Sequence, residues 1–128
     1  CGRYRPYRNE TMNQNQANAF AAKWIEAWNA HDLDRILSHY TDDFEMNSPL
    51  IAKRLAVPSG TLKGKAAVGE YWQGALRAYP DLRFELLKVL RGVSWVTLYY
   101  LGATGNEVAE TFLFDGNGKV TQVFASYA

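Results

Sequence analysis

The sequence is poor in the residues that most often build disulfide frameworks and metal sites. Its single cysteine is Cys1, so the chain can form neither an internal disulfide nor a cysteine-based metal site. Its two histidines, His31 and His39, do not stand at the i, i+2 or i, i+4 spacing of paired metal ligands. We therefore expect no metal ion to bind.

The sequence also lacks an excess of one charge and any long apolar run. Its 14 basic and 13 acidic residues leave a net charge of +1, which argues against a nucleic-acid partner. No apolar run approaches the ~20 residues that span a bilayer, so we expect no membrane partner and a cytoplasmic protein. A mature bacterial lipoprotein, with Cys1 acylated, is the alternative.

The first residues lack the apolar periodicity of a packed element. We expect residues 1–12 to be a flexible tail ahead of a single domain at residues 13–128, since a chain of 128 residues is long enough for one core. Three arginines alternate there with Tyr4 and Tyr7 and could stack on single-stranded nucleic acid. A solvated tail is the preferred interpretation.

Aromatic residues, in contrast, are abundant: four Trp, eight Tyr and six Phe, which fill cores and line apolar pockets. Many of them stand at helical spacing. Apolar residues recur every three or four positions over residues 17–28, 33–40 and 68–79, which predicts three amphipathic helices. Pro80 ends the third helix.

Both histidines and five carboxylates fall within residues 29–45, which is the composition of a catalytic cluster. Most of these residues have a structural explanation instead. Asp32 can cap the second helix, Asp34 complements the dipole of that helix, and residues 41–43 are turn formers that lead into a strand. For His31 and His39, a solvated ring or a hydrogen bond to the backbone is commoner than catalysis.

The remaining pattern is typical of β-strands. A short strand carries Phe44, Met46 and Ser48 on one face and breaks at Pro49, and a loop over residues 50–63 follows. Glycine-rich turns separate four further strands at residues 83–91, 94–101, 107–114 and 119–128. The order α-α-β-α-β-β-β-β predicts an α+β fold with a curved, mostly antiparallel sheet packed on helices. Because several strands are apolar on both faces, we expect a homodimer through the open face.

Three segments resemble signature regions of the nuclear transport factor 2-like superfamily: WNAHDLDRILSHYTDDFEMNSP, GTLKGKAAVGEYW and AETFLFDGNGKV. The chain looks closest to the SnoaL-like branch, which holds polyketide cyclases, and it is similar to ketosteroid isomerases. The resemblance implies a conical α+β barrel with a deep apolar pocket between sheet and helices, commonly a dimer and usually without a cofactor. It therefore predicts a protein that binds a small hydrophobic ligand or substrate.

Glu110 is the main candidate for a catalytic residue. Strand alternation places it on one face with Phe112 and Phe114, so it is either buried or directed into a cavity, where an unpaired carboxylate is costly. A glutamate at a strand end that reaches solvent or pairs with a basic residue is the alternative. In the resemblance to ketosteroid isomerases, Glu110 falls at the acid of the oxyanion hole. The general-base aspartate falls at Ser48 and the donor tyrosine at Trp24.

Two tyrosines, Tyr71 and Tyr99, couple an apolar ring to a hydroxyl that can orient a ligand carbonyl, and they complete the predicted catalytic set. The expected ligand-binding residues are Trp24, Trp28, Met46, Ser48, Trp72, Phe112, Phe124 and Ser126. Two functions remain open. One is a cofactor-independent isomerase, cyclase or hydrolase that acts on an apolar carbonyl- or polyketide-like compound. The other is a non-catalytic dimeric module that binds a small hydrophobic ligand or serves as a scaffold.

Overall fold

The computed structural model describes residues 12–128 as four helices and six strands. The helices are α2 (Gln14–Asn29), α3 (Leu33–Leu37), α4 (Pro49–Leu55) and α5 (Lys65–Ala78). The strands are β1 (Tyr40–Asn47), β2 (Thr61–Lys63), β3 (Glu85–Arg91), β4 (Trp95–Leu101), β5 (Glu107–Phe114) and β6 (Val120–Tyr127).

The tail expected at residues 1–12 lies outside the described residues, except for its last member. The Met12 N–H donates to the Val93 carbonyl at 2.9 Å, and the partly buried Met12 side chain packs against the core. Met12 therefore belongs to the folded part of the chain.

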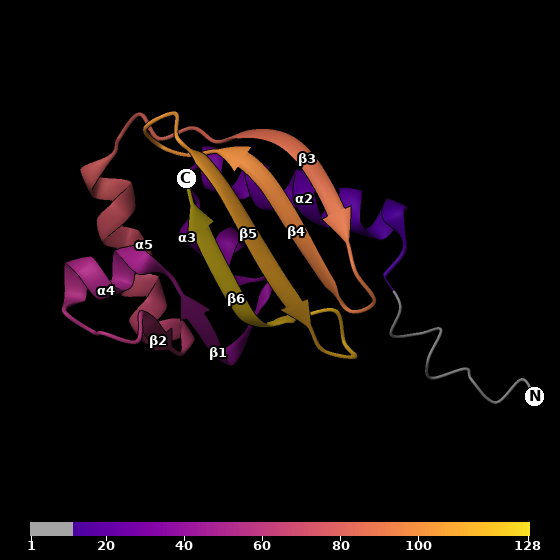
Figure 1. Cartoon of the computed structure of the whole chain (residues 1–128), viewed down its shortest axis with the longest axis horizontal. Coiled ribbons are helices and arrows are strands. Elements are labelled where there is room, and N and C mark those ends of the chain that lie inside the picture. Colours follow the sequence, from indigo (N-terminus) through magenta and orange to yellow (C-terminus); the bar gives the residue numbers. More distant parts are fainter. Residues whose placement is uncertain (1–11) are drawn as a thin grey trace, which may run out of the picture.

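All six strands form one curved, unclosed sheet in the order β2-β1-β6-β5-β4-β3. Neighbouring strands are antiparallel except β1 and β6, which run parallel. In Figure 1, α2 and α3 run behind the sheet and α4 and α5 lie beyond β6, whereas no helix crosses in front of β3 to β6. This arrangement confirms the predicted α+β class.

Helix α2 begins at a capping box. The Asn13 side chain accepts from the Gln16 N–H at 2.8 Å, and the Gln16 side chain accepts from the Asn13 N–H at 2.9 Å. The buried residues of the helix follow the predicted spacing: Ala17, Ala21, Trp24, Ala27 and Trp28. This stripe places two indole rings in the core, and that of Trp24 packs on Tyr100 and Phe112 of the sheet.

Helix α3 is shorter than predicted because the chain enters the sheet earlier. The Asp32 side chain accepts from the Arg35 N–H at 3.2 Å, which confirms the predicted cap, but the helix spans only five residues. The turn expected at residues 41–43 is wrong, since these residues lie in β1, at an irregular stretch of its pairing with β6. Buried Tyr40 and Phe44 flank that stretch, and their burial outweighs the turn preference of Thr and Asp.

The loop expected at residues 50–63 contains two elements that the predicted order lacks. Ser48 is the N-cap of α4, its Oγ accepts from the Leu50 N–H at 3.1 Å, and Pro49 takes the first helical turn. Buried Ile51 anchors this helix to the core. Strand β2 then pairs antiparallel with β1. The observed order is α-α-β-α-β-α-β-β-β-β, because the proline expected only to break a strand also starts a helix.

The strands alternate between an inner face, which packs on the helices, and an outer face. In β4, Val96, Leu98 and Tyr100 are buried on the inner face. Trp95, on the outer face of the same strand, is 44% exposed. Both faces of β4 therefore carry large apolar side chains, but only those of the inner face are buried.

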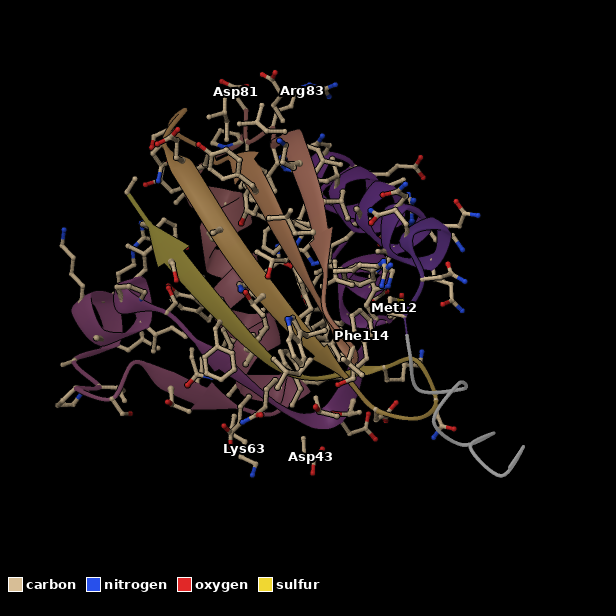
Figure 2. All side chains as sticks on the ribbon, turned by 45° about the vertical axis from the view of Figure 1, so that its right-hand side comes forward. Met12, Asp43, Lys63, Asp81, Arg83 and Phe114 are labelled. Atoms are coloured by element: carbon tan, nitrogen blue, oxygen red, sulfur yellow. The ribbon has the colours of Figure 1, made fainter. Side chains whose placement is uncertain are left out.

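Some charged side chains project from opposite ends of the molecule. In Figure 2, Asp81 and Arg83 project near the start of β3, and Asp43 and Lys63 project at the opposite end. Within residues 12–128, no helix combines the length and apolar character that a membrane crossing requires.

Candidate functional site

A cavity of about 280 Å³ lies between the inner face of the sheet and helices α2, α4 and α5. Aromatic rings dominate its apolar wall: Trp24, Trp28, Trp72, Phe84 and Tyr100. Its polar groups come from separate elements: Ser48, Arg54, Tyr71, Tyr79, Thr104, Asn106, Glu110 and Tyr127. A concave, mostly apolar space with a few convergent polar groups is the usual form of a small-molecule site.

Glu110 and Tyr100 form a buried polar pair in this wall. They stand on neighbouring antiparallel strands, where Tyr100 is opposite Val108 and Glu110 is opposite Leu98, so both side chains lie on the inner face. Only 4% of Glu110 and 3% of Tyr100 is exposed. The Tyr100 hydroxyl donates to Glu110 Oε1 at 2.5 Å.

Burial controls the titration of this pair. It raises the pKa of Glu110 to about 7, and the hydrogen bond from Tyr100 opposes the shift only in part. Burial, followed by the charge of Glu110, raises the pKa of Tyr100 well above its ordinary value, so the phenol stays protonated and remains the donor. Near neutral pH, Glu110 is therefore present both as carboxylic acid and as carboxylate, which suits it to acid–base chemistry.

A second buried hydrogen bond lies close to this pair. Trp24 Nε1 donates to the Tyr40 hydroxyl at 2.9 Å. Burial, followed by the charge of Glu110, raises the pKa of Tyr40 well above its ordinary value, so this phenol is also neutral. Because its N–H is engaged by the protein, Trp24 offers the cavity an aromatic ring and no free donor.

Tyr127 and Tyr71 add hydroxyl groups from the end of β6 and from α5. Burial raises the pKa of Tyr127 to about 12 and the charge of Glu110 adds to this shift, while Ser48 and Arg54 oppose it. Burial also raises the pKa of Tyr71, against the effect of Arg54. Both phenols are therefore protonated at neutral pH and can donate to a ligand oxygen.

The structure brings several predicted site residues together in the cavity wall: Glu110, Tyr71, Trp24, Trp28, Met46, Ser48 and Trp72. They come from α2, β1, the start of α4, α5 and β5, which are far apart in the sequence. The cavity is thus lined by residues from distant parts of the chain.

Other predicted site residues lie elsewhere, and their assignment is corrected. Tyr99, Phe124 and Ser126 are on the outer face, because the inner positions of β4 and β6 are occupied by their neighbours in the chain. The Tyr99 hydroxyl donates to Glu107, away from the cavity. Phe112 is on the inner face, but it is fully buried against Phe20 and Trp24 and does not line the cavity.

Sequence reasoning misses Tyr100, Arg54, Tyr79 and Tyr127. Both faces of β4 are apolar, so alternation alone does not say whether Tyr99 or Tyr100 faces the helices. The hairpin supplies a usable signal, because counting outward from the GATGN turn pairs Tyr100 with Val108, on the same face as Glu110. Arg54 lies on the segment that the sequence predicts to be a loop.

The histidines of residues 29–45 have structural surroundings. His31 Nε2 lies 2.9 Å from the Leu82 carbonyl oxygen. His39 packs edge-on against Phe20, with ring centroids 5.3 Å apart, and burial, with help from Lys119, lowers its pKa. Within residues 12–128, no group of three His, Cys, Asp or Glu side chains is placed to hold a metal ion.

The chain matches one protein family and is similar to several solved structures. The SnoaL-like domain family matches residues 21–124. A SnoaL-like protein of unknown function from Burkholderia thailandensis E264 is 50% identical to this chain, and the match covers 93% of this chain and 99% of that chain with a TM-score of 0.91. No curated protein matches the chain in sequence.

Two more distant structures share the fold. AclR, a proposed hydroxylase from Streptomyces galilaeus, is 20% identical, with 91% of each chain covered and a TM-score of 0.71. IdmH, a proposed polyketide cyclase from Streptomyces antibioticus, is 16% identical, with 88% of this chain and 91% of that chain covered and a TM-score of 0.72. At these identities the likeness shows a common fold, on which reactions of different classes occur.

Proposed function

The chain belongs to the SnoaL-like family, and from its site we propose that it is an enzyme that moves a proton within an apolar carbonyl compound. One observation carries the proposal: the Glu110 carboxyl is buried in the wall of an aromatic cavity, where its pKa is about 7. A catalytic base or acid works best when its pKa lies near the working pH. Among the described residues, Glu110 also supplies the only carboxyl group of this wall.

The reaction that this arrangement supports is a proton shift through an enolate. The Glu110 carboxylate takes a proton from the carbon next to the substrate carbonyl. The C–H electron pair becomes the C=C bond of the enolate, and the negative charge moves to the carbonyl oxygen. If the substrate has a C=C bond beyond that carbon, the enolate is a dienolate. The carboxylic acid then returns the proton to the far carbon of the dienolate, which gives the isomer in which the C=C bond is conjugated with the carbonyl. In a substrate with a second carbonyl, the enolate carbon instead attacks that group and the new alkoxide takes the proton, which closes a ring.

Neighbouring residues supply what such a reaction requires. The hydroxyl groups of Tyr71 and Tyr127 can donate to the enolate oxygen as its charge develops. The hydrogen bond from Tyr100 orients the Glu110 carboxyl. The aromatic wall holds the apolar body of the substrate and keeps bulk water away from the enolate.

Solvent deuterium exchange of 2-tetralone, an apolar ketone with acidic α-hydrogens, tests this proposal. We expect the protein to accelerate exchange at the α-carbon, with a rate that rises as pH passes through about 7, since the carboxylate is the base. Glu110→Gln should reduce the acceleration by roughly 100-fold or more, the usual contribution of a general base. Isothermal titration calorimetry should show that this variant still binds the ketone.

Tyr99→Phe is the matched control for this experiment. It removes a phenol that also contacts a glutamate, but on the outer face, so the exchange rate should not change. Full acceleration in Glu110→Gln would overturn the assignment of Glu110 as the base.

A second function, ligand binding without turnover, is favoured by Ser48. In the resemblance to ketosteroid isomerases this residue falls at the position of the aspartate base, and its Oγ is engaged in capping α4. In that case 2-tetralone should bind with a heat signal and exchange no faster than in buffer at any pH.

A further inference from the structure

Arg54 is the one cation in the cavity wall that the described residues form. It is exposed in the last turn of α4, so it stands where the cavity meets solvent. Its guanidinium donates to the Tyr79 hydroxyl at 3.4 Å, and its Cζ lies 6.0 Å from the centre of the Tyr79 ring. The Ser48 cap and the buried Ile51 side chain hold the helix that carries Arg54.

Arg54 has no carboxylate within 4.0 Å among residues 12–128. The ion pairs of that part of the chain join other residues: Arg35–Glu26, Lys63–Glu45 and Lys65–Asp42. The pKa of Glu110 responds to burial and to the hydrogen bond from Tyr100. An arginine stays charged at any working pH, so this positive charge lies at the cavity with no carboxylate of residues 12–128 in contact with it.

Besides Tyr100, three tyrosines line the cavity together with this charge. Arg54 lowers the pKa of both Tyr71 and Tyr127 against the effect of burial, which places both hydroxyls within its electric field. Arg54, Tyr71, Tyr79 and Tyr127, which we call the Arg54 cluster, all line the cavity. The cluster thus combines one full positive charge with hydroxyl donors from separate elements.

A carboxylate matches this combination better than other anions. The guanidinium fork can donate to both carboxylate oxygens, and one negative charge balances one positive charge. A phosphate dianion carries more negative charge than the single arginine can balance, and no lysine lines the cavity in the described part of the chain.

We propose that the Arg54 cluster binds the carboxylate of an apolar organic acid whose carbonyl end reaches Glu110 and Tyr100. This inference names a substrate class for the proposed function. It rests on that proposal because it takes the same cavity as the ligand site. The cavity of about 280 Å³ is just below the ~300–1,000 Å³ of sites for drug-sized ligands, so the acid has a body of about one or two rings.

Calorimetric titration with 2-naphthoic acid and with its uncharged isostere 2-naphthamide tests the inference near pH 7. The wild-type protein should bind the naphthoate roughly tenfold more tightly than the amide, because only the naphthoate forms charge-assisted hydrogen bonds. Arg54→Gln removes the charge and keeps a polar side chain. It should weaken naphthoate binding roughly tenfold and change amide binding less than about twofold.

Two further variants sharpen the result. Lys53→Gln removes a positive charge from the neighbouring exposed position of the same helix, outside the cavity wall, and should change binding of either ligand less than about twofold. Arg54→Lys keeps the charge but loses the planar fork, so its naphthoate affinity should fall between those of wild type and Arg54→Gln.

Three outcomes would overturn the inference: no naphthoate binding to the wild type, equal loss of both ligands in Arg54→Gln, or an equal naphthoate loss in Lys53→Gln. The failure of the proposed function is a separate outcome, because 2-tetralone carries no carboxylate. Its exchange depends on Glu110 whatever the Arg54 variants show.

Discussion

Tyr99 and Tyr100 are adjacent in β4, and each donates its hydroxyl to a glutamate of β5, Tyr99 to Glu107 and Tyr100 to Glu110. The two pairs share the same chemistry but lie on opposite faces of one sheet. For Tyr99, the hydrogen bond with Glu107 is the largest cause of its raised pKa. For Tyr100, burial is the largest cause.

The difference shows that the surroundings, more than the hydrogen bond, make one of these pairs a candidate catalytic group. Water reaches the outer pair and can solvate a carboxylate there, which keeps the energetic value of such surface contacts small. Around Glu110 water is excluded, so ionisation is costly and the hydrogen bond from Tyr100 offsets only part of that cost. Changes to the inner pair should therefore have large effects, and the same changes to the outer pair should have small ones.

The largest expected effect is a pH dependence of stability carried by Glu110. Its pKa is about 7 in the folded protein against an ordinary value of 4.5, so the folded state holds this proton over a pH range in which the unfolded chain has lost it. The contribution of Glu110 to stability is therefore highest below about pH 4.5, falls between about pH 4.5 and 7, and levels off above. At about 1.36 kcal/mol per pH unit, the fall amounts to roughly 3 kcal/mol.

Urea unfolding at a series of pH values measures this contribution. Glu110→Gln should remove most of the fall, because glutamine does not titrate. Glu107→Gln, the matched change on the outer face, should keep the wild-type profile. Identical pH profiles for wild type and Glu110→Gln would contradict the assigned environment of Glu110.

A smaller effect is expected when the donors are removed one at a time. Tyr100→Phe leaves the buried Glu110 carboxyl without its donor and should lower the free energy of unfolding by about 1–3 kcal/mol. Since the hydrogen bond lowers the pKa of Glu110, its loss should move that pKa above about 7. Tyr99→Phe should change the stability by less than about 0.5 kcal/mol.

Denaturation and carbon NMR titration of the labelled glutamate carboxyl groups give both quantities for each variant. Equal stability losses in Tyr99→Phe and Tyr100→Phe would refute the contrast between the two faces. A pKa of Glu110 that stays at about 7 in Tyr100→Phe would show that the hydrogen bond does not act on its titration.

Features that depend on local spacing are predictable from the sequence. The stripe of α2, the Asp32 cap and the α+β class follow from periodicity and from the residues at helix ends. Apolar neighbours at alternate positions likewise point to a buried setting for Glu110. These signals need no knowledge of which elements meet in space.

Features that depend on distant parts of the chain are not predictable in this way. Whether Tyr99 or Tyr100 faces the cavity depends on which face of β4 the helices cover, and both faces are apolar. Pro49 can break a strand or begin a helix, and the outcome depends on the Ser48 cap and on a buried site for Ile51. The missed helix α4 also carries the cavity residue Arg54.

The smallest effect on folding is expected on the outer face, where we propose that a second copy of this chain packs. Leu90, Thr97, Thr111 and Phe124 lie opposite one another across β3 to β6. Leu90 is 52% and Phe124 is 40% exposed, and Figure 1 shows no helix in front of these strands. Exposed large apolar side chains on a sheet face that no helix covers are typical of an interface between identical subunits.

Phe124→Lys should break this association without unfolding the chain. Sedimentation equilibrium at micromolar concentration should give about twice 14.5 kDa for the wild type and 14.5 kDa for the variant. Because only an associating protein is stabilised by its own concentration, the midpoint of thermal unfolding should rise with concentration in the wild type and stay constant in Phe124→Lys. Val123→Ala, one residue away but fully buried on the inner face, should lower the stability and leave the association intact. A wild type that sediments as a monomer would contradict the proposed interface. The outer face would then be solvent-exposed surface, and the two faces would differ only in the burial of the inner one.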